Sequence, residues 1–179
     1  MAESFTNSLT RAAGIVTNTS LGTIGITTNK ITGISTVGIA VSDLVQTSNY
    51  IAGTKVSSVG AGEVVCDRDS TNTGAATSQS VYFLGPTTAY TSASGNKSIL
   101  VGGTFANNTE SQVNVTVSVY DNSAGTEVGL ASKIPVPNGS SFVISDVGKT
   151  DLESLDEVRV YTDTANAIDA SLSILKGVS

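Results

Sequence analysis

The sequence predicts an all-β protein: an antiparallel β-sandwich with an N-terminal arm and a small β-hairpin module. Three observations lead to this fold class. Roughly a quarter of the 179 residues are Ser or Thr, and Thr, Val and Ile carry the branched β-carbons that suit a pleated strand. Several segments alternate apolar and polar residues with a period of two. Turns rich in Gly and Asn separate these segments.

We expect three parts along the chain. Residues 1–30 form an N-terminal extended arm or strand, residues 31–80 a small β-hairpin module, and residues 81–179 a C-terminal β-sandwich. In the first part of the chain the isoleucines keep no single period and glycines interrupt every short apolar run. This region has few large apolar anchors, so we expect it to draw stability from the sandwich or from neighbouring copies.

The stretch "KVSSVGAGEVVCD" decides between a phosphate-binding loop and a simple turn. A phosphate loop needs a third glycine or a Gly-Lys-Ser/Thr ending, followed by a helix. Here Gly60 and Gly62 are followed by Glu63 and β-branched residues, and a carboxylate repels phosphate. We therefore predict two strands joined by a "GAG" turn.

The segment "SQVNVTVSVYD", which starts at Ser111, has the strictest alternation. It predicts a half-buried antiparallel strand. The preceding run "KSILVGGTFANNTE" ends in an Asn-rich turn, so we expect these two strands to pair as a hairpin. The residues predicted to face the core from the first of these segments are Val113, Val115, Val117 and Val119.

The remaining strands follow at intervals of eight to twelve residues, as in a sandwich. "TEVGLASKIPVPNGSSFVISDVGK" predicts two strands around a hairpin turn at Asn138-Gly139. In "DEVRVYTD" the inward residues are Val158 and Val160, and "KTDLESLDE" is expected to form one bridging helical turn. In "AIDASLSILKG" the inward residues are Ile168, Ala170, Leu172 and Ile174.

Composition and charge exclude several classes of protein. Only 13% of residues are charged, the net charge is −6 and the nine Lys and Arg are scattered, which argues against a nucleic-acid partner. No apolar stretch reaches the ~18 residues of a membrane span, so we expect no membrane partner. There is no histidine, and Cys66 has no second cysteine to pair with. We therefore predict no cofactor.

Acidic segments of the chain leave open a catalytic function or a metal site. Paired carboxylates in a cleft could act as acid and base, but the two segments with such pairs are more simply acidic turns or strand ends facing solvent. A calcium site in "YDNSAGTE" is similarly weak, because the oxygen ligands are sparse and Asp-Asn-Ser is turn chemistry. We predict no catalytic, cofactor or metal residue; the residues weighed were Asp67, Asp69, Asp151, Glu153, Asp156 and Glu157 for catalysis, and Asp121, Asn122 and Glu127 for calcium.

Two segments resemble structural proteins of tailed phages. "ITGISTVGIAVSDLV" followed by "GTKVSSVGAGEVVCDRDST" looks like a short β-module of such proteins, in which a strand pair precedes a hairpin. The opening resembles "M-A-x-x-F-T-x-x-x-x-R", and the end approximates the "A-x-D-A-x-x-S-x-L" strand of small virion proteins from marine phages and cyanophages. The matching residues are Ile31, Gly33, Ile34, Val41, Asp43, Gly53, Thr54, Val56, Gly60 and Gly62 for the module, Met1, Ala2, Phe5, Thr6 and Arg11 for the opening, and Ala167, Asp169, Ala170, Ser173 and Leu175 for the last strand.

This resemblance implies a non-enzymatic structural component of a tailed-phage virion. A capsid decoration protein is the first expectation, with a neck or tail position close behind. Its partners would be further copies of itself, in a homo-oligomer, and virion proteins such as the major capsid protein. It would be made in the host cytoplasm and reside in the virion, since "MAESFTNSLTR" shows no secretory signal.

Two sets of residues are candidates for contact with partners. The arm either adds a strand to an adjacent subunit or packs on its own sandwich. An alternative function is a carbohydrate- or receptor-binding fibre module, which would present aromatic rings to a sugar; its candidates are Tyr50 and Tyr90. The candidates for subunit contact are Phe5, Leu9, Arg11, Ile15, Val16, Ile24 and Ile26.

Overall fold

The structure is a computed structural model that describes residues 3–145 and 149–178. These residues form antiparallel sheets and contain no helix, which confirms the all-β prediction. The chain divides into two compact units. Unit 1 consists of residues 1–14 and 87–179, and unit 2 of residues 15–86. Unit 2 is therefore an insertion in the chain of unit 1.

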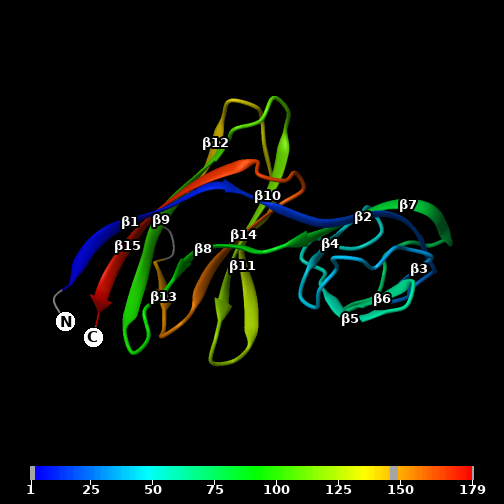
Figure 1. Cartoon of the computed structure of the whole chain (residues 1–179), viewed down its shortest axis with the longest axis horizontal. Coiled ribbons are helices and arrows are strands. Elements are labelled where there is room, and N and C mark those ends of the chain that lie inside the picture. The colour runs from blue at the N-terminus through cyan, green and yellow to red at the C-terminus, as the bar shows by residue number, and fades with distance from the viewer. Residues whose placement is uncertain (1–2, 146–148, 179) are drawn as a thin grey trace. The chain divides into compact units, whose positions relative to one another are not determined.

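Unit 1 is the β-sandwich, built from two sheets (Figure 1). In sheet A, the order is β1 (Ser4–Ala13), β15 (Ile168–Val178), β9 (Lys97–Asn107) and β12 (Ser141–Ile144), and β13 (Thr150–Leu152) also pairs with β9. In sheet C, the order is β11 (Thr126–Val136), β10 (Val113–Asp121), β14 (Glu157–Thr162) and β8 (Thr87–Thr91). Both sheets are antiparallel throughout.

The core of unit 1 lies between the inner faces of these two sheets, as the alternating patterns predict. The inward residues of β10, β14 and β15 are buried, which confirms the predicted faces of all three strands. Val119, at the end of β10, is half-buried against the same core. Sheet A adds Phe105, whose ring stacks on Phe142 with 5.7 Å between the ring centroids. Burial of these branched side chains is the main stabilising contribution to the sandwich.

The predicted hairpin between β9 and β10 is wrong. The two strands lie in opposite sheets, so the Asn-rich segment between them crosses the sandwich. Asn107 organises the crossing: its side-chain amide donates to the Ser111 carbonyl (2.7 Å) and the Val136 carbonyl (2.9 Å). Its side-chain oxygen accepts from the Thr109 amide at 2.8 Å. A single buried Asn thus satisfies the main-chain groups that a crossing loop leaves unpaired.

Two further local predictions need correction. A turn does form at Asn138-Gly139, with Gly139 at φ +65°, but it joins β11 of sheet C to β12 of sheet A and is no hairpin. The segment predicted as a helical turn instead contains β13 and a tight turn before β14. Leu152 is fully buried there whereas Leu155 is exposed, so the two leucines do not share a helical face.

Residues 1–30 are not one arm. β1 pairs along its length with β15 of its own sandwich, and the two strands lie side by side in Figure 1. β2 (Ile15–Ile24) belongs to unit 2 and pairs with β7 (Ala76–Gly85). The structure thus divides the chain at residues 14–15 and 86–87, not at the expected boundaries of 30 and 80. The physical reason is that each half of the arm finds an open strand to pair with.

Unit 2 is one six-stranded sheet, sheet B, that closes on itself. Its order is β4 (Leu44–Gln46), β7, β2, β3 (Lys30–Thr32), β6 (Glu63–Cys66) and β5 (Val56–Gly60). The two end strands are joined by main-chain bonds: the Ser42 amide donates to the Val56 carbonyl (2.8 Å), and the Val45 amide donates to the Thr54 carbonyl (2.8 Å). Closure into a small barrel leaves few unpaired strand edges.

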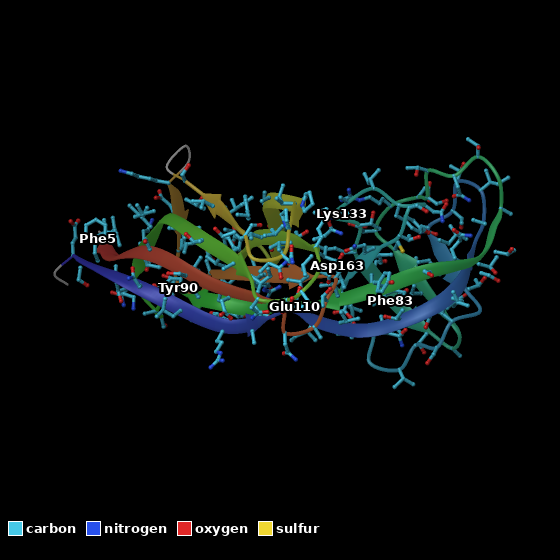
Figure 2. The ribbon with its side chains drawn as sticks, turned by 90° about the horizontal axis from the view of Figure 1, so that it is seen from above. Phe5, Phe83, Tyr90, Glu110, Lys133 and Asp163 are labelled. Atoms are coloured by element: carbon cyan, nitrogen blue, oxygen red, sulfur yellow. The ribbon has the colours of Figure 1, made fainter. Side chains whose placement is uncertain are left out.

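This closure gives unit 2 a core of its own, although few large apolar anchors were apparent in its sequence. Buried isoleucines and valines surround Phe83, which Figure 2 labels, and Phe83 is fully buried. The predicted turn in "GAG" is confirmed, because β5 and β6 pair antiparallel with Gly60 opposite Glu63. Gly62 has φ +73°, a conformation that glycine adopts without strain.

Candidate interaction surface

The outer face of sheet A exposes several large apolar side chains. The odd-numbered residues of β1 from Phe5 to Arg11 point outward, and Phe5 and Leu9 are each 75% exposed. Figure 2 labels Phe5 near the start of β1. The register places Phe5 beside Leu175, and Leu175 beside Ile99. Four residues further along β1, on the same face, Leu9 begins a second row of cross-strand neighbours. This row continues across the sheet through Ser171, Thr104 and Val143.

Small residues make this face hollow between its apolar edges. One open hollow of about 320 Å³ lies beside Leu9 and Arg11 and is floored by Thr104, Ala106 and Ser171. A second, of about 400 Å³, continues from Thr104 and Ser171 to Val143. Gly102 and Gly103 lie in its floor. A shallow trough rimmed by Leu9 and Val143 therefore crosses the sheet, and its shape suits projecting side chains of a protein partner.

Glycines at positions 102 and 103 leave room for close packing around β9. A β-carbon there would lie 2.6 Å from Leu172 Cδ2, which is inside van der Waals contact. A β-carbon at Gly102 would lie 2.9 Å from the carbonyl oxygen of Ile144 in β12. The two glycines thus allow the core below and the neighbouring strand to approach β9 closely.

β1 is also an edge strand, because it pairs with β15 on one side and with no described strand on the other. Its register with β15 is regular from Ser4 to Thr10, and a bulge follows between Thr10 and Ala13. The carboxylate of Asp169 fixes this bulge by accepting from the Ala12 amide at 2.7 Å. An edge of this length presents a row of free main-chain donors and acceptors.

The predicted subunit-contact residues are thus separated by the fold. Phe5, Leu9 and Arg11 lie together on the exposed face of β1. The others belong to unit 2, where Ile15 and Ile26 are exposed and Val16 is half-buried. Ile24 is fully buried in the core of unit 2, so it cannot contact a partner. The residues that stay together are those of β1.

The two tyrosines considered for sugar binding are buried, which corrects that assignment. Tyr50 is 5% exposed, and its hydroxyl donates to the Thr28 carbonyl at 2.9 Å. Tyr90 is 8% exposed, and its hydroxyl lies 2.9 Å from the hydroxyl of Ser98. Neither ring face is available to a sugar. Each tyrosine instead packs its ring into a core and satisfies its hydroxyl there.

The acidic residues do not converge on a cleft. Asp156, expected in a solvent-facing turn, is 4% exposed, and its carboxylate accepts from the amides of Asn122 (3.0 Å) and Glu153 (2.9 Å). The Asp121 carboxylate accepts from the Ala124 amide and from the Ser123 hydroxyl within its own turn, and these hydrogen bonds lower its pKa. Within residues 3–145 and 149–178, no three Cys, Asp or Glu side chains gather as a metal site would require.

A buried polar network on the outer face of sheet C was not predicted from the sequence. The carboxylate of Glu127 has a side-chain exposure of 4% and accepts from the hydroxyls of Tyr161 (2.8 Å) and Ser118, and from the Arg159 guanidinium (3.2 Å). Arg159 also donates to Glu157 at 2.8 Å and stacks over the Tyr120 ring. Burial, followed by the charge of Glu127, raises the pKa of Tyr161. This network ties β11, β10 and β14 together.

The only sequence signal for this network is an acid, an arginine and a tyrosine at outward positions of strands. Glu127 had been considered for calcium with Asp121, yet its carboxylate is instead committed to Tyr161 and Arg159. Because the residues of this network come from three strands, their meeting depends on strand order. Strand order is not visible in the alternation of the sequence.

Comparison with models of protein families, with curated proteins and with solved structures finds no match to this chain. No helix long and apolar enough to cross a membrane occurs in the part of the chain that the structure describes.

Proposed function

We propose that this protein is a non-enzymatic structural component of a tailed-phage virion, bound to the capsid surface as a decoration protein. The observation that carries the proposal is the outer face of sheet A, where exposed Leu9 and Val143 rim a trough floored by small side chains. A rigid sandwich with such a face is suited to binding a protein lattice by shape and apolar contact. The resemblance of the sequence to phage structural proteins supplies the identity of that lattice.

The chemistry of the rest of the molecule is compatible with this role. The buried carboxylates of Asp156 and Glu127 accept hydrogen bonds within a turn and within the network on sheet C, respectively. No observation favours the sugar-binding alternative, since Tyr50 and Tyr90 are buried.

The test is co-sedimentation of the full chain in a density gradient with tail-free capsids and, separately, with isolated tails. We expect saturable binding to capsids. Val143→Asp on β12 and Ser171→Arg on β15 both alter the trough and should weaken binding at least about tenfold. Val128→Asp on β11 is the matched control, because Val128 is 66% exposed but lies in sheet C.

Binding to tails alone would move the protein to the neck or tail and overturn the decoration role. Binding to neither particle would overturn the virion role altogether. Equal effects of Val143→Asp and Val128→Asp would show that the outer face of sheet A is not the surface used.

A further inference from the structure

We propose that two copies of this chain associate through β1, whose free edges pair antiparallel about a two-fold axis at Asn7. The two A sheets then form one continuous sheet. This inference goes beyond the proposed function, because it concerns the partner of one edge strand and needs no virion protein.

The first step is that the edge of β1 is open and regular. Alternate residues of an antiparallel strand direct their N–H and C=O groups to opposite sides, so half of those groups in β1 point away from β15. From Ser4 to Thr10 the register with β15 has no bulge, and this segment contains no proline and no charged residue. Bulges, prolines and charged residues are the features by which proteins normally block strand pairing, and this segment has none of them.

The other described edges are blocked. β11 carries Pro135, two register shifts against β10 and a positive φ at Lys133. β8 is five residues long with a register shift, and β12 and β13 are shorter still. The end strands of unit 2 bond to one another. Among the strands that the structure describes, β1 is thus the one long regular edge.

The second step is that the outward side chains of β1 complement themselves. Residues 3, 5, 7, 9 and 11 are Glu, Phe, Asn, Leu and Arg, and all are exposed. A two-fold axis at Asn7 puts Phe5 of one copy opposite Leu9 of the other. It also puts the two Asn7 amides opposite each other. Just beyond the regular segment, it brings Glu3, which precedes β1, to Arg11, which lies in the bulge after Thr10. Asn7 is the midpoint of the regular segment from Ser4 to Thr10.

These pairings match cross-strand chemistry. An aromatic ring beside an aliphatic side chain and a carboxylate beside a guanidinium both stabilise antiparallel pairs. Neither Glu3 nor Arg11 has an ion-pair partner within the described part of its own chain, so both charges are available. On the inner side the same register sets Ser4 opposite Thr10 and Thr6 opposite Ser8. The hydroxyls of Ser8 and Thr10 donate to the Ala89 carbonyl of β8 in their own chain (2.8 and 3.4 Å), so on this side the pairing rests on the main chain.

Neighbouring registers lose this complementarity. A shift by one pair in one direction sets Phe5 against Arg11 and Asn7 against Leu9. A shift in the other direction sets Glu3 against Leu9 and Phe5 against Asn7. Of these three registers, only the one centred on Asn7 pairs apolar side chains with apolar ones and a positive charge with a negative one. Such self-complementarity is what an isologous two-fold interface requires.

A disulfide trap tests the register directly. Asn7→Cys in the full chain places two thiols directly opposite across the axis, within the reach of a disulfide. We expect mild oxidation to give a covalent dimer. Ser173→Cys is the matched control: Ser173 is exposed and pairs with Asn7 within the chain, but it lies one strand further from the axis. Equal dimer yields from the two variants, or no dimer from Asn7→Cys, would overturn the proposal.

Charge reversal gives a second readout that does not depend on a new thiol. Arg11→Glu sets two carboxylates against each other on both sides of the axis and should weaken dimerisation at least about tenfold. Adding Glu3→Arg restores opposite charges and should restore the dimer. Lys133→Glu is the control for net charge, because Lys133 is an exposed cation on β11. The same dimer dissociation constant for Arg11→Glu and Lys133→Glu would contradict the register.

These results are separable from the virion role. A monomer that still binds capsids would overturn the β1 dimer alone. A trapped dimer that binds neither capsids nor tails would leave the dimer standing and overturn the proposed function.

Discussion

Tyr161 and Glu127 lie on the outer face of a sheet and are nevertheless buried. Tyr161 is 1% exposed, and its hydroxyl reaches both oxygens of the Glu127 carboxylate. Arg159 supplies the compensating charge at 3.2 Å. A carboxylate removed from water is tolerated only when its lone pairs are filled in this way. The network is therefore a point at which a single substitution has large consequences.

We expect Glu127→Ala to lower the free energy of unfolding of unit 1 by about 3 kcal/mol, because it leaves buried hydroxyls and a guanidinium without their acceptor. Chemical denaturation measures this change. The control is Glu153→Ala: Glu153 pairs with Lys97 at 3.0 Å, but its side chain is 61% exposed, so no measurable change is expected. Equal losses for the two variants would contradict the role of the network.

Cys66 provides a pH-dependent prediction. Burial raises the pKa of its thiol from 9.0 to about 11. Iodoacetamide at pH 8 should therefore leave Cys66 unmodified in the folded chain and alkylate it in denaturant. The thiolate forms first in the unfolded state, so stability should fall as pH rises from about 9 to 11, and the fall should be smaller in Cys66→Ala. Rapid alkylation of the folded chain would contradict this assignment.

Whether a single aromatic residue is buried or exposed was the hardest feature to predict from the sequence. Tyr50 and Tyr90 are candidates for sugar binding by their aromatic rings, yet both rings are buried and each hydroxyl has a partner inside its core. An amphipathic side chain can be placed only when its neighbours are known, and those neighbours are far away in the sequence. Nothing in the sequence marks Thr28 and Ser98 as the hydrogen-bond partners of these two tyrosines.

At the level of the strands, the alternation of apolar and polar residues predicted correctly which side chains face the core, but the strand pairs inferred from the order of the sequence were wrong. The inward residues of β10 and β15 are buried as expected, since a period of two fixes which side chains share a face. The same pattern is silent on which strands pair. β9 and β10 adjoin in sequence, but each supplies an inner face to a different sheet. The arm prediction for residues 1–30 failed for the same reason, because the sequence does not show that β1 pairs with β15, at the far end of the chain.

The crossing between β9 and β10 depends on Asn107. We expect Asn107→Ala to destabilise unit 1 by about 2 kcal/mol, because the Ser111 and Val136 carbonyls and the Thr109 amide lose their partner. Asn108→Ala is the control, since Asn108 is exposed and its side chain makes one longer bond, to Asp169 at 3.2 Å. Thermal unfolding of the two variants compares them. A melting temperature unchanged by Asn107→Ala would show that the crossing does not need this side chain.

At the level of the whole molecule, the chain is a sandwich with a second closed domain inserted after its first strand. Each unit has its own buried core. The two ends of the insertion leave unit 1 close together, because the Gly14 amide donates to the Thr87 hydroxyl at 3.1 Å. The main-chain carbonyls of Ala13 and Gly14 are also held, by the amides of Ala167 and Asn166.

We therefore expect residues 15–86 to be replaceable by an Asn-Gly turn without loss of the sandwich fold. A two-residue turn suits ends that already lie this close. Far-ultraviolet circular dichroism and a cooperative thermal transition would report folding of the shortened chain. Since β1 remains in place, Arg11→Glu should affect association of the shortened chain as it does in the full chain. A shortened chain that does not fold would show that unit 1 depends on unit 2.

The proposed binding face of sheet A lies furthest from what the sequence could predict. Composition excluded classes of chemistry, and alternation gave the fold class, but a binding face is defined by strand order and by what remains exposed. Phe5 and Leu9 became informative only once β1 was placed at the edge of sheet A with both side chains 75% exposed.

That the exposed edge and face of sheet A serve association is tested most directly by the mass of the full chain in solution. Sedimentation velocity over concentrations up to about 0.1 mM covers the affinity range of a modest interface. We expect a reversible, concentration-dependent rise from the monomer mass of 18.1 kDa to twice that value, abolished by Arg11→Glu. A chain that stays at 18.1 kDa throughout would contradict association through β1.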